Sequence, residues 1–165
     1  MKTPLCEFCL HTRDLCGGCL HKLETGAISQ ADVEVSRVLE KFREKLALEQ
    51  VILTRAEDCG NILFLFTQTS PGLLIGRGGK TISVLIKESG KHIRVVQETT
   101  DFHKLVEEVL HPVKPKSVSG VFHDGKETTK ITVPRFLNHK LPTTPEKLGQ
   151  MLEKVLKKTV KIVLE

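Results

Sequence analysis

Two short segments of this 165-residue chain carry residue types that could do chemistry: a glycine-rich turn and a group of paired cysteines. The turn lies in residues 72–82, GLLIGRGGKTI, which follow the apolar run Ile62–Phe66. A glycine-rich turn at the start of a helix leaves backbone N–H groups free and lets another backbone approach closely. The positive end of the helix dipole, with Arg77 and Lys80 beside it, favours a phosphate group. The turn is therefore predicted to bind the phosphate of a nucleotide or of a nucleic-acid backbone.

The spacing of the glycines distinguishes a nucleotide-binding turn from one that binds a nucleic-acid backbone. A P-loop that ends in residues 79–81 needs a glycine where this chain has Leu74. The dinucleotide fingerprint and the kinase glycine loop both need a glycine in place of Thr81. The pattern that fits is I-G-x-x-G at Ile75–Gly79, set between two short helical segments. The alternative is a turn that serves chain reversal alone.

The cysteines indicate a metal site. Two C-x-x-C pairs fall within residues 1–24, and the fifth cysteine, Cys59, lies in the predicted turn at 58–61. Four thiolates are the ligand set that tetrahedral zinc prefers, and a zinc ion with four protein ligands is structural because it keeps no open position. Redox or iron–sulfur use remains an alternative, and His11 or His21 could replace one thiolate. The predicted ligands of Zn2+ are Cys6, Cys9, Cys16 and Cys19.

Composition narrows the class of protein. The odd cysteine count argues against a disulfide framework and favours a reducing compartment. The net charge of +5 is compatible with nucleic acid, whereas the absence of Trp and Tyr argues against aromatic stacking platforms of the RRM or OB type. No apolar run approaches the roughly 20 residues of a membrane span, and no signal peptide begins the chain. We expect a soluble, cytoplasmic protein with no membrane partner.

Three pieces are predicted along the chain: residues 1–24, 27–98 and 101–165. The first has little apolar periodicity, so metal binding would supply most of its folding free energy. The second begins with a capping box at Ser29 and a helix. A hairpin of Val51–Thr54 with Ile62–Phe66 follows, then the glycine-rich turn, a helix with Ile82, Leu85 and Ile86 on one face, and a strand at Ile93–Val96.

The third piece repeats this order without the glycine pattern. We predict a helix at Phe102–Leu110, a hairpin of Ser117–Phe122 with Thr129–Val133, a short segment at Arg135–Leu141, a helix capped by Thr144 and a strand at Val160–Leu164. An unrelated α/β extension is the alternative interpretation, because the repeat depends on element order alone.

Residues 27–98 resemble the KH type II family of RNA-binding domains, in which a G-x-x-G loop clamps a few backbone nucleotides. With residues 101–165 as a second KH-like unit that lacks the loop, the chain resembles the archaeal NusA-like proteins. The resemblance implies a mixed α/β (α+β) fold of two KH type II-like units in tandem, preceded here by a small zinc-binding knuckle. The cysteine-rich head is not part of the NusA pattern.

The resemblance implies a non-catalytic factor that binds single-stranded RNA and acts in transcription elongation or termination. The residues that it assigns to RNA are Ile75, Gly76, Arg77, Gly78, Gly79, Lys80 and Ile82, with Leu85 and Val95 better explained as core. RNA polymerase or a ribosomal particle would be the large partner, and no small-molecule substrate is expected. The alternative is an adaptor associated with the ribosome or an RNA-processing complex, acting through protein contacts.

The remaining residues indicate no catalytic site. The sequence shows no nucleophile–base pair, no paired carboxylates in a turn and no H-x-E before the cysteines, so we expect no enzyme. Lysines near the C-terminus, assigned to the last helix, form a solvated face or a secondary RNA contact: Lys147, Lys154, Lys157, Lys158 and Lys161.

Overall fold

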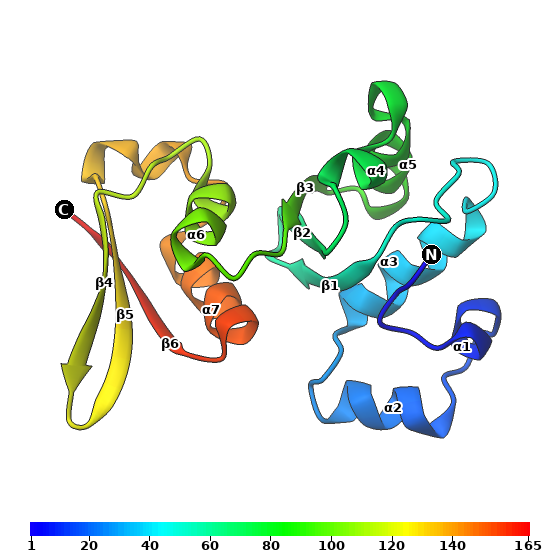
Figure 1. Ribbon diagram of the computed structural model, residues 1–165, viewed down its shortest axis with the longest axis horizontal. Helices are drawn as coiled ribbons and strands as arrows, with labels where there is room; N and C mark the ends of the chain where they lie inside the picture. Colours follow the sequence, from blue (N-terminus) through cyan, green and yellow to red (C-terminus); the bar gives the residue numbers. More distant parts are fainter. The chain divides into compact units, whose positions relative to one another are not determined.

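The computed structural model describes all residues, 1–165, as a mixed α+β protein with two small three-stranded sheets (Figure 1). Backbone packing divides the chain into unit 1, Met1–Glu98, and unit 2, Thr99–Glu165. The cysteine-rich head, residues 1–24, belongs to unit 1. No helix combines the length and the apolar character that crossing a membrane requires.

Unit 1 begins with two short helices, α1 (Glu7–His11) and α2 (Gly17–Glu24). They share a small apolar cluster with the start of α3 (Gln30–Lys41), formed by the buried residues Leu5, Cys9, Cys19, Ile28 and Val33. Before α1, Lys2 exchanges backbone hydrogen bonds with Val51 and Leu53. The head is therefore tied to the rest of unit 1 on both sides of its cysteines.

The predicted capping box at the start of α3 is confirmed, and it also connects this helix to the first strand of the sheet. Ser29 Oγ accepts the N–H of Asp32, and the Asp32 carboxylate accepts the Ser29 N–H at 2.7 Å. The same buried carboxylate accepts the N–H of Ala56 at 2.6 Å, and Ser29 Oγ donates to the Ala56 carbonyl. One sequence-local motif thus fixes α3 against the first strand of the sheet.

The sheet of unit 1 is mixed. Strand β1 (Leu53–Asp58) pairs antiparallel with β2 (Ile62–Thr67), which pairs parallel with β3 (His92–Gln97). The prediction of the first strand at Val51–Thr54 is wrong in its bounds. The predicted strand ends four residues too early: β1 is an edge strand with a register shift after Leu53, and an edge strand tolerates the charged residues at 55 and 57.

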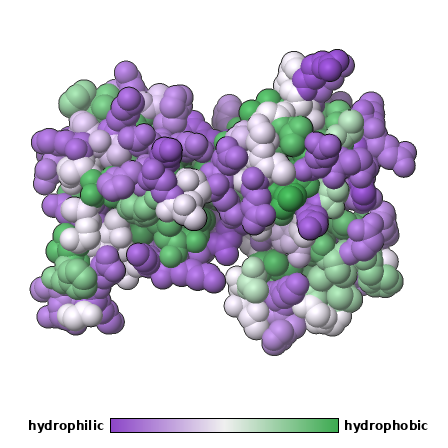
Figure 2. All heavy atoms as spheres, viewed as in Figure 1, coloured by the Kyte–Doolittle hydropathy of each residue, from purple (hydrophilic) through white to green (hydrophobic).

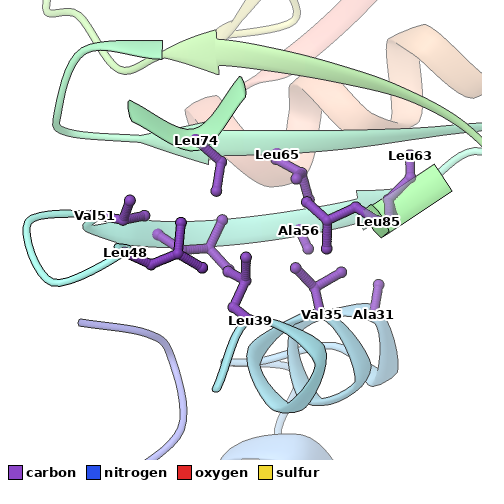
Figure 3. Close-up of a cluster of buried hydrophobic side chains, with 11 residues drawn as sticks. Ala31, Val35, Leu39, Leu48, Val51, Ala56, Leu63, Leu65, Leu74 and Leu85 are labelled. Atoms are coloured by element: carbon purple, nitrogen blue, oxygen red, sulfur yellow. The ribbon is translucent and has the colours of Figure 1, made fainter. Parts of the chain in front are cut away.

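Between β2 and β3 the chain forms α4 (Pro71–Ile75), the short 3-10 turn η1 (Arg77–Gly79) and α5 (Lys80–Ser89). These elements and α3 enclose the main core, in which β2 supplies Leu63 and Leu65, and α3 supplies Val35 and Leu39 (Figure 3). Leu74 of α4 and Leu85 of α5 complete it, so the glycine-rich turn lies between two helices that are each anchored by a buried leucine.

Unit 2 has the same strand order and strand directions. After α6 (Phe102–Leu110), β4 (Ser117–His123) pairs antiparallel with β5 (Lys126–Val133), which pairs parallel with β6 (Thr159–Leu164). The 3-10 segment η2 (Arg135–Lys140) and α7 (Pro145–Leu156) lie between the last two strands in sequence, and the predicted Thr144 cap of α7 is confirmed.

The assignment of five lysines to the last helix is wrong for three of them. Helix α7 ends at Leu156, Lys157 adopts a left-handed backbone conformation after it, and Lys161 lies in β6. The apolar positions that predicted this helix end at Leu156, and the left-handed residue Lys157 ends the helix there, so the lysines that follow do not share its face.

Candidate functional sites

The glycine loop, residues 76–79, is shaped by three glycines with positive φ. Gly76 has φ 80° and ψ 164°, and Gly78 and Gly79 have φ 62° and 73°. A Cβ at Gly76 would lie 2.9 Å from the backbone nitrogen of Thr81, whereas a Cβ at Gly78 would meet nothing within 4 Å. Gly76 is therefore required for packing inside the loop, and Gly78 faces open space.

Few donors of the loop are used within it. Gly79 N–H donates to the Gly76 carbonyl at 3.0 Å, and Lys80 N–H donates to the Arg77 carbonyl. This leaves the N–H groups of Arg77 and Gly78 for a ligand. The Arg77 and Lys80 side chains are exposed and form no ion pair. The loop thus presents two amides and two cations, which is a donor set for a phosphate group.

An apolar border lies next to these donors. Leu73 and Ile75 of α4 are 41% and 36% exposed, and Ile86 of α5 is 40% exposed. Ile82 is half-buried one turn before Ile86. Both helices that flank the glycine loop thus expose large aliphatic side chains.

Two predictions for this border are now decided by burial. Leu85 is buried in the core, and Val95 packs against the same core, as expected. The prediction that Ile82, Leu85 and Ile86 share one face is wrong, because Ile86 points to solvent while Leu85 is buried. Leu73 and Ile86 were missed as candidate contacts. The position of Ile86 four residues after Ile82 was a signal in the sequence, whereas Leu73 gave none.

The cysteine cluster brings together Cys6, Cys9, Cys16 and Cys19, whose sulfur atoms all lie within 4.8 Å of one another. The Sγ atoms of Cys6 and Cys16 are 3.8 Å apart. Zinc–sulfur bonds of about 2.3 Å in a tetrahedron require sulfurs about 3.8 Å apart. The four cysteines therefore could hold a metal ion, with a spacing that fits zinc. Cys59 is buried in the β1–β2 turn and does not belong to the cluster.

The pKa values of the clustered thiols show how strongly neighbouring sulfurs affect one another. An N–H from Cys19 and the neighbouring Cys9 thiol lower the pKa of Cys16 to about 6. An N–H from Cys16 also stabilises the Cys9 thiolate, but burial and the other thiols outweigh it and raise the pKa of Cys9 to about 12. The neighbouring thiols thus oppose a second negative charge at Cys9. Only a bound cation allows all four sulfurs to carry charge together.

The cysteine cluster includes neither His11 nor His21, the histidines proposed as substitute ligands. His11 Nε2 is 3.7 Å from Glu7 and 3.6 Å from Glu40, within an ion-pair network that also includes Arg43. A second contact joins the head to α3, because Arg37 donates to the carbonyls of Cys9 and Arg13. The cluster is thus held against a helix of unit 1.

These features define the class of protein only broadly: a mixed α+β chain with two three-stranded sheets, a glycine loop and a cysteine cluster. No protein-family model and no curated protein matches the sequence. Among solved structures, the chain is similar to one titled "Crystal structure of APE1850", with a TM-score of 0.56 and 22% sequence identity over 78% of this chain and 96% of that chain. At this identity the likeness shows a shared fold alone.

Proposed function

We propose that this chain is a non-catalytic factor that binds single-stranded RNA at the glycine loop. The observation that carries the proposal is the loop itself. It offers the free amides of Arg77 and Gly78 and the unpaired cations of Arg77 and Lys80, beside the exposed aliphatic border of α4 and α5. Phosphates would bind the amides and cations, and bases would lie against Ile75 and Ile82.

The topology supports a KH type II interpretation of unit 1. The order α3, β1, β2, α4, glycine loop, α5, β3, with one antiparallel and one parallel strand pair, is the order that the resemblance to KH domains implies. Unit 2 repeats the sheet order without the loop. A tandem KH factor of the archaeal NusA-like kind is therefore the proposed identity, with a role in transcription elongation or termination in the cytoplasm.

We assign the cysteine cluster to a structural Zn2+ ion. Four sulfurs and no free coordination position give zinc no catalytic role here, so its contribution would be to fold residues 1–24 and to hold them against α3. When bound, zinc supplies the positive charge that the four thiolates require.

A second candidate function is an adaptor that docks through the head onto RNA polymerase or a ribosomal particle. The observation that favours it is the exposure of two large apolar side chains on α1 and α2, Phe8 at 63% and Leu20 at 45%. Figure 2 shows apolar side chains among hydrophilic ones over the region of these two helices. An adaptor of this kind needs no RNA affinity.

The test is a titration of the zinc-loaded protein with fluorescein-labelled single-stranded RNA. The double variant Arg77→Asp/Gly78→Asp should weaken binding about tenfold or more, which corresponds to a loss of about 1.4 kcal/mol. Asp is among the residues that tolerate a left-handed backbone, and the site at Gly78 is open, so the variant should stay folded.

A matched control makes the same charge change elsewhere in unit 1. Lys22→Asp/Gly26→Asp alters an exposed lysine and a positive-φ glycine with open space around it. Equal binding by both variants would remove the loop assignment, and a wild-type protein without RNA affinity would favour the adaptor.

A further inference from the structure

The basic excess of the chain lies in the unit that has no glycine loop. Unit 2 has twelve lysines and arginines against eight acidic residues, whereas unit 1 has thirteen against twelve. Of the net charge of +5, unit 2 therefore carries +4. An RNA site confined to the glycine loop does not account for this distribution.

Strand register places part of this charge on one face of the sheet. The buried residues Ile131 and Val133 of β5 and Val160 of β6 point toward α7, where a Cβ added at Gly149 would lie 3.7 Å from the Val160 carbonyl oxygen. Because successive side chains alternate between faces, the residues between them point to the opposite side. In Figure 1, α6 and α7 lie on the same side of this sheet, and no helix of unit 2 covers the other side.

We define the uncovered side as the open sheet face. Cross-strand pairing puts these residues on it: Ser117, Ser119, Val121 and His123 of β4; Lys126, Thr128, Lys130 and Thr132 of β5; Thr159, Lys161 and Val163 of β6; and Glu165 after β6. Lys126 and Lys161 are exposed, Lys130 is half-buried and Thr132 is buried. Glu165 is the sole acidic residue among them, in an exposed pair with Lys130 at 3.7 Å.

Two of these lysines repel each other. Lys130 and Lys161 are direct partners in the parallel β5–β6 pairing, with strands about 4.8 Å apart. Like charges directly opposite in a sheet are destabilising. Lys126 lies four residues before Lys130 on the same face, about 13 Å along the strand. A polyanion would neutralise this repulsion, and the three lysines, amid serine and threonine hydroxyls, match such a ligand.

We propose that the open sheet face of unit 2 is a second RNA-binding surface, which contacts the phosphate backbone through Lys126, Lys130 and Lys161. The choice of RNA as the polyanion rests on the proposed function. Charge complementarity supports it, since lysines and hydroxyl groups are the usual protein partners of phosphate oxygens. The surface would be sequence-independent, because it presents no Arg, Asn or Gln side chain of the kind that makes bidentate contacts with base edges.

The experiment measures the salt dependence of RNA affinity in the zinc-loaded full chain, with fluorescein-labelled single-stranded RNA of mixed sequence and potassium chloride. For single strands, log K falls with log salt, and each lost phosphate contact makes this slope less steep by about 0.7. The double variant Lys126→Gln/Lys161→Gln should therefore make the slope less steep by about 1.4. Both side chains are exposed and neither forms an ion pair, so their removal breaks no contact within the fold.

The matched control is Lys104→Gln/Lys114→Gln, which removes two exposed lysines from α6 and from the segment that follows it. It has the same net charge and should leave the slope close to that of the wild type. Equal slopes for the two variants would overturn the proposal. Without RNA, Lys161→Gln should keep or raise the melting temperature, because it removes the repulsion with Lys130; a lower melting temperature would also contradict the argument.

The loop variant Arg77→Asp/Gly78→Asp separates this inference from the proposed function. If that variant loses RNA while the open-face variant keeps the wild-type slope, the glycine loop stands and the open-face proposal fails. If the open-face variant lowers the salt dependence while the loop variant binds RNA like the wild type, the open-face proposal stands and the glycine-loop assignment fails. Binding of poly-glutamate in place of RNA, with the same loss in the open-face variant, would assign the surface to an acidic protein and overturn the proposal as stated.

Discussion

Substituting Gly76 by alanine tests how the glycine loop is held. The backbone of Gly76 lies at φ 80° and ψ 164°, a region that is essentially reserved for glycine. An alanine Cβ there would also lie 2.9 Å from the Thr81 backbone nitrogen, at the first turn of α5. Thr81 is buried and its backbone belongs to the helix, so it has little freedom to move away.

The expected loss of stability is the sum of two contributions, the backbone strain at position 76 and the close contact with Thr81. Backbone strain of this kind costs about 1–3 kcal/mol, and forcing an atom into a packed site adds about 1–3 kcal/mol. We expect Gly76→Ala to reduce the free energy of unfolding of unit 1 by about 4 kcal/mol. The control is Gly78→Ala, at φ 62° and ψ 21° with open space, which should cost about 1–2 kcal/mol from its left-handed backbone alone.

The assay is native-state hydrogen exchange of the β2 amides, Ile62–Thr67, which form the buried centre of unit 1. Core amides of this kind report the opening of their own unit. Circular dichroism gives an independent midpoint, which about 4 kcal/mol should lower by roughly 20 °C for a unit of this size. The reasoning would be refuted by equal costs for the two variants, or by a larger cost at Gly78.

Three further outcomes are expected. Asp32→Ala should destabilise unit 1 by about 3 kcal/mol in urea denaturation, because it removes the helix cap and leaves the buried Ala56 N–H unpaired. The control is Glu34→Ala, at an exposed site of the same helix. Similar losses of stability in the two variants would contradict the bridging role of Asp32. Arg43 donates two hydrogen bonds that lower the pKa of Glu49, so this pair stabilises the fold above the ordinary glutamate pKa of about 4.3 and the gain is lost as pH falls through the lowered value. Glu49→Gln should therefore flatten the acid limb of unfolding free energy against pH, and an unchanged limb would refute the pairing. Chelation at neutral pH should release one zinc ion per chain by atomic absorption and expose the amides of α1 and α2 to exchange before those of β2; simultaneous exchange would show that the head does not depend on metal.

Local patterns made most elements predictable from the sequence. The Ser29 capping box, the Thr144 cap with Pro145 and the bounds of Phe102–Leu110 depend on residues within one or two turns of each other, and the structure has them as expected. The first strand of unit 1 was misplaced because its charged residues are acceptable only at a sheet edge, and edge position is a tertiary property.

The sequence by itself determined the chemistry of both candidate sites. Glycine spacing and adjacent cations predict a phosphate-binding turn, and two C-x-x-C pairs predict four sulfurs that could hold a metal ion, because short-range geometry follows from residue type and spacing. Only the tertiary structure decided which neighbours take part. It buried Leu85 and exposed Ile86, tied the head to α3 through Arg37, and set Lys130 beside Lys161. Those outcomes depend on strand register and helix packing between residues far apart in the chain, which no local pattern encodes.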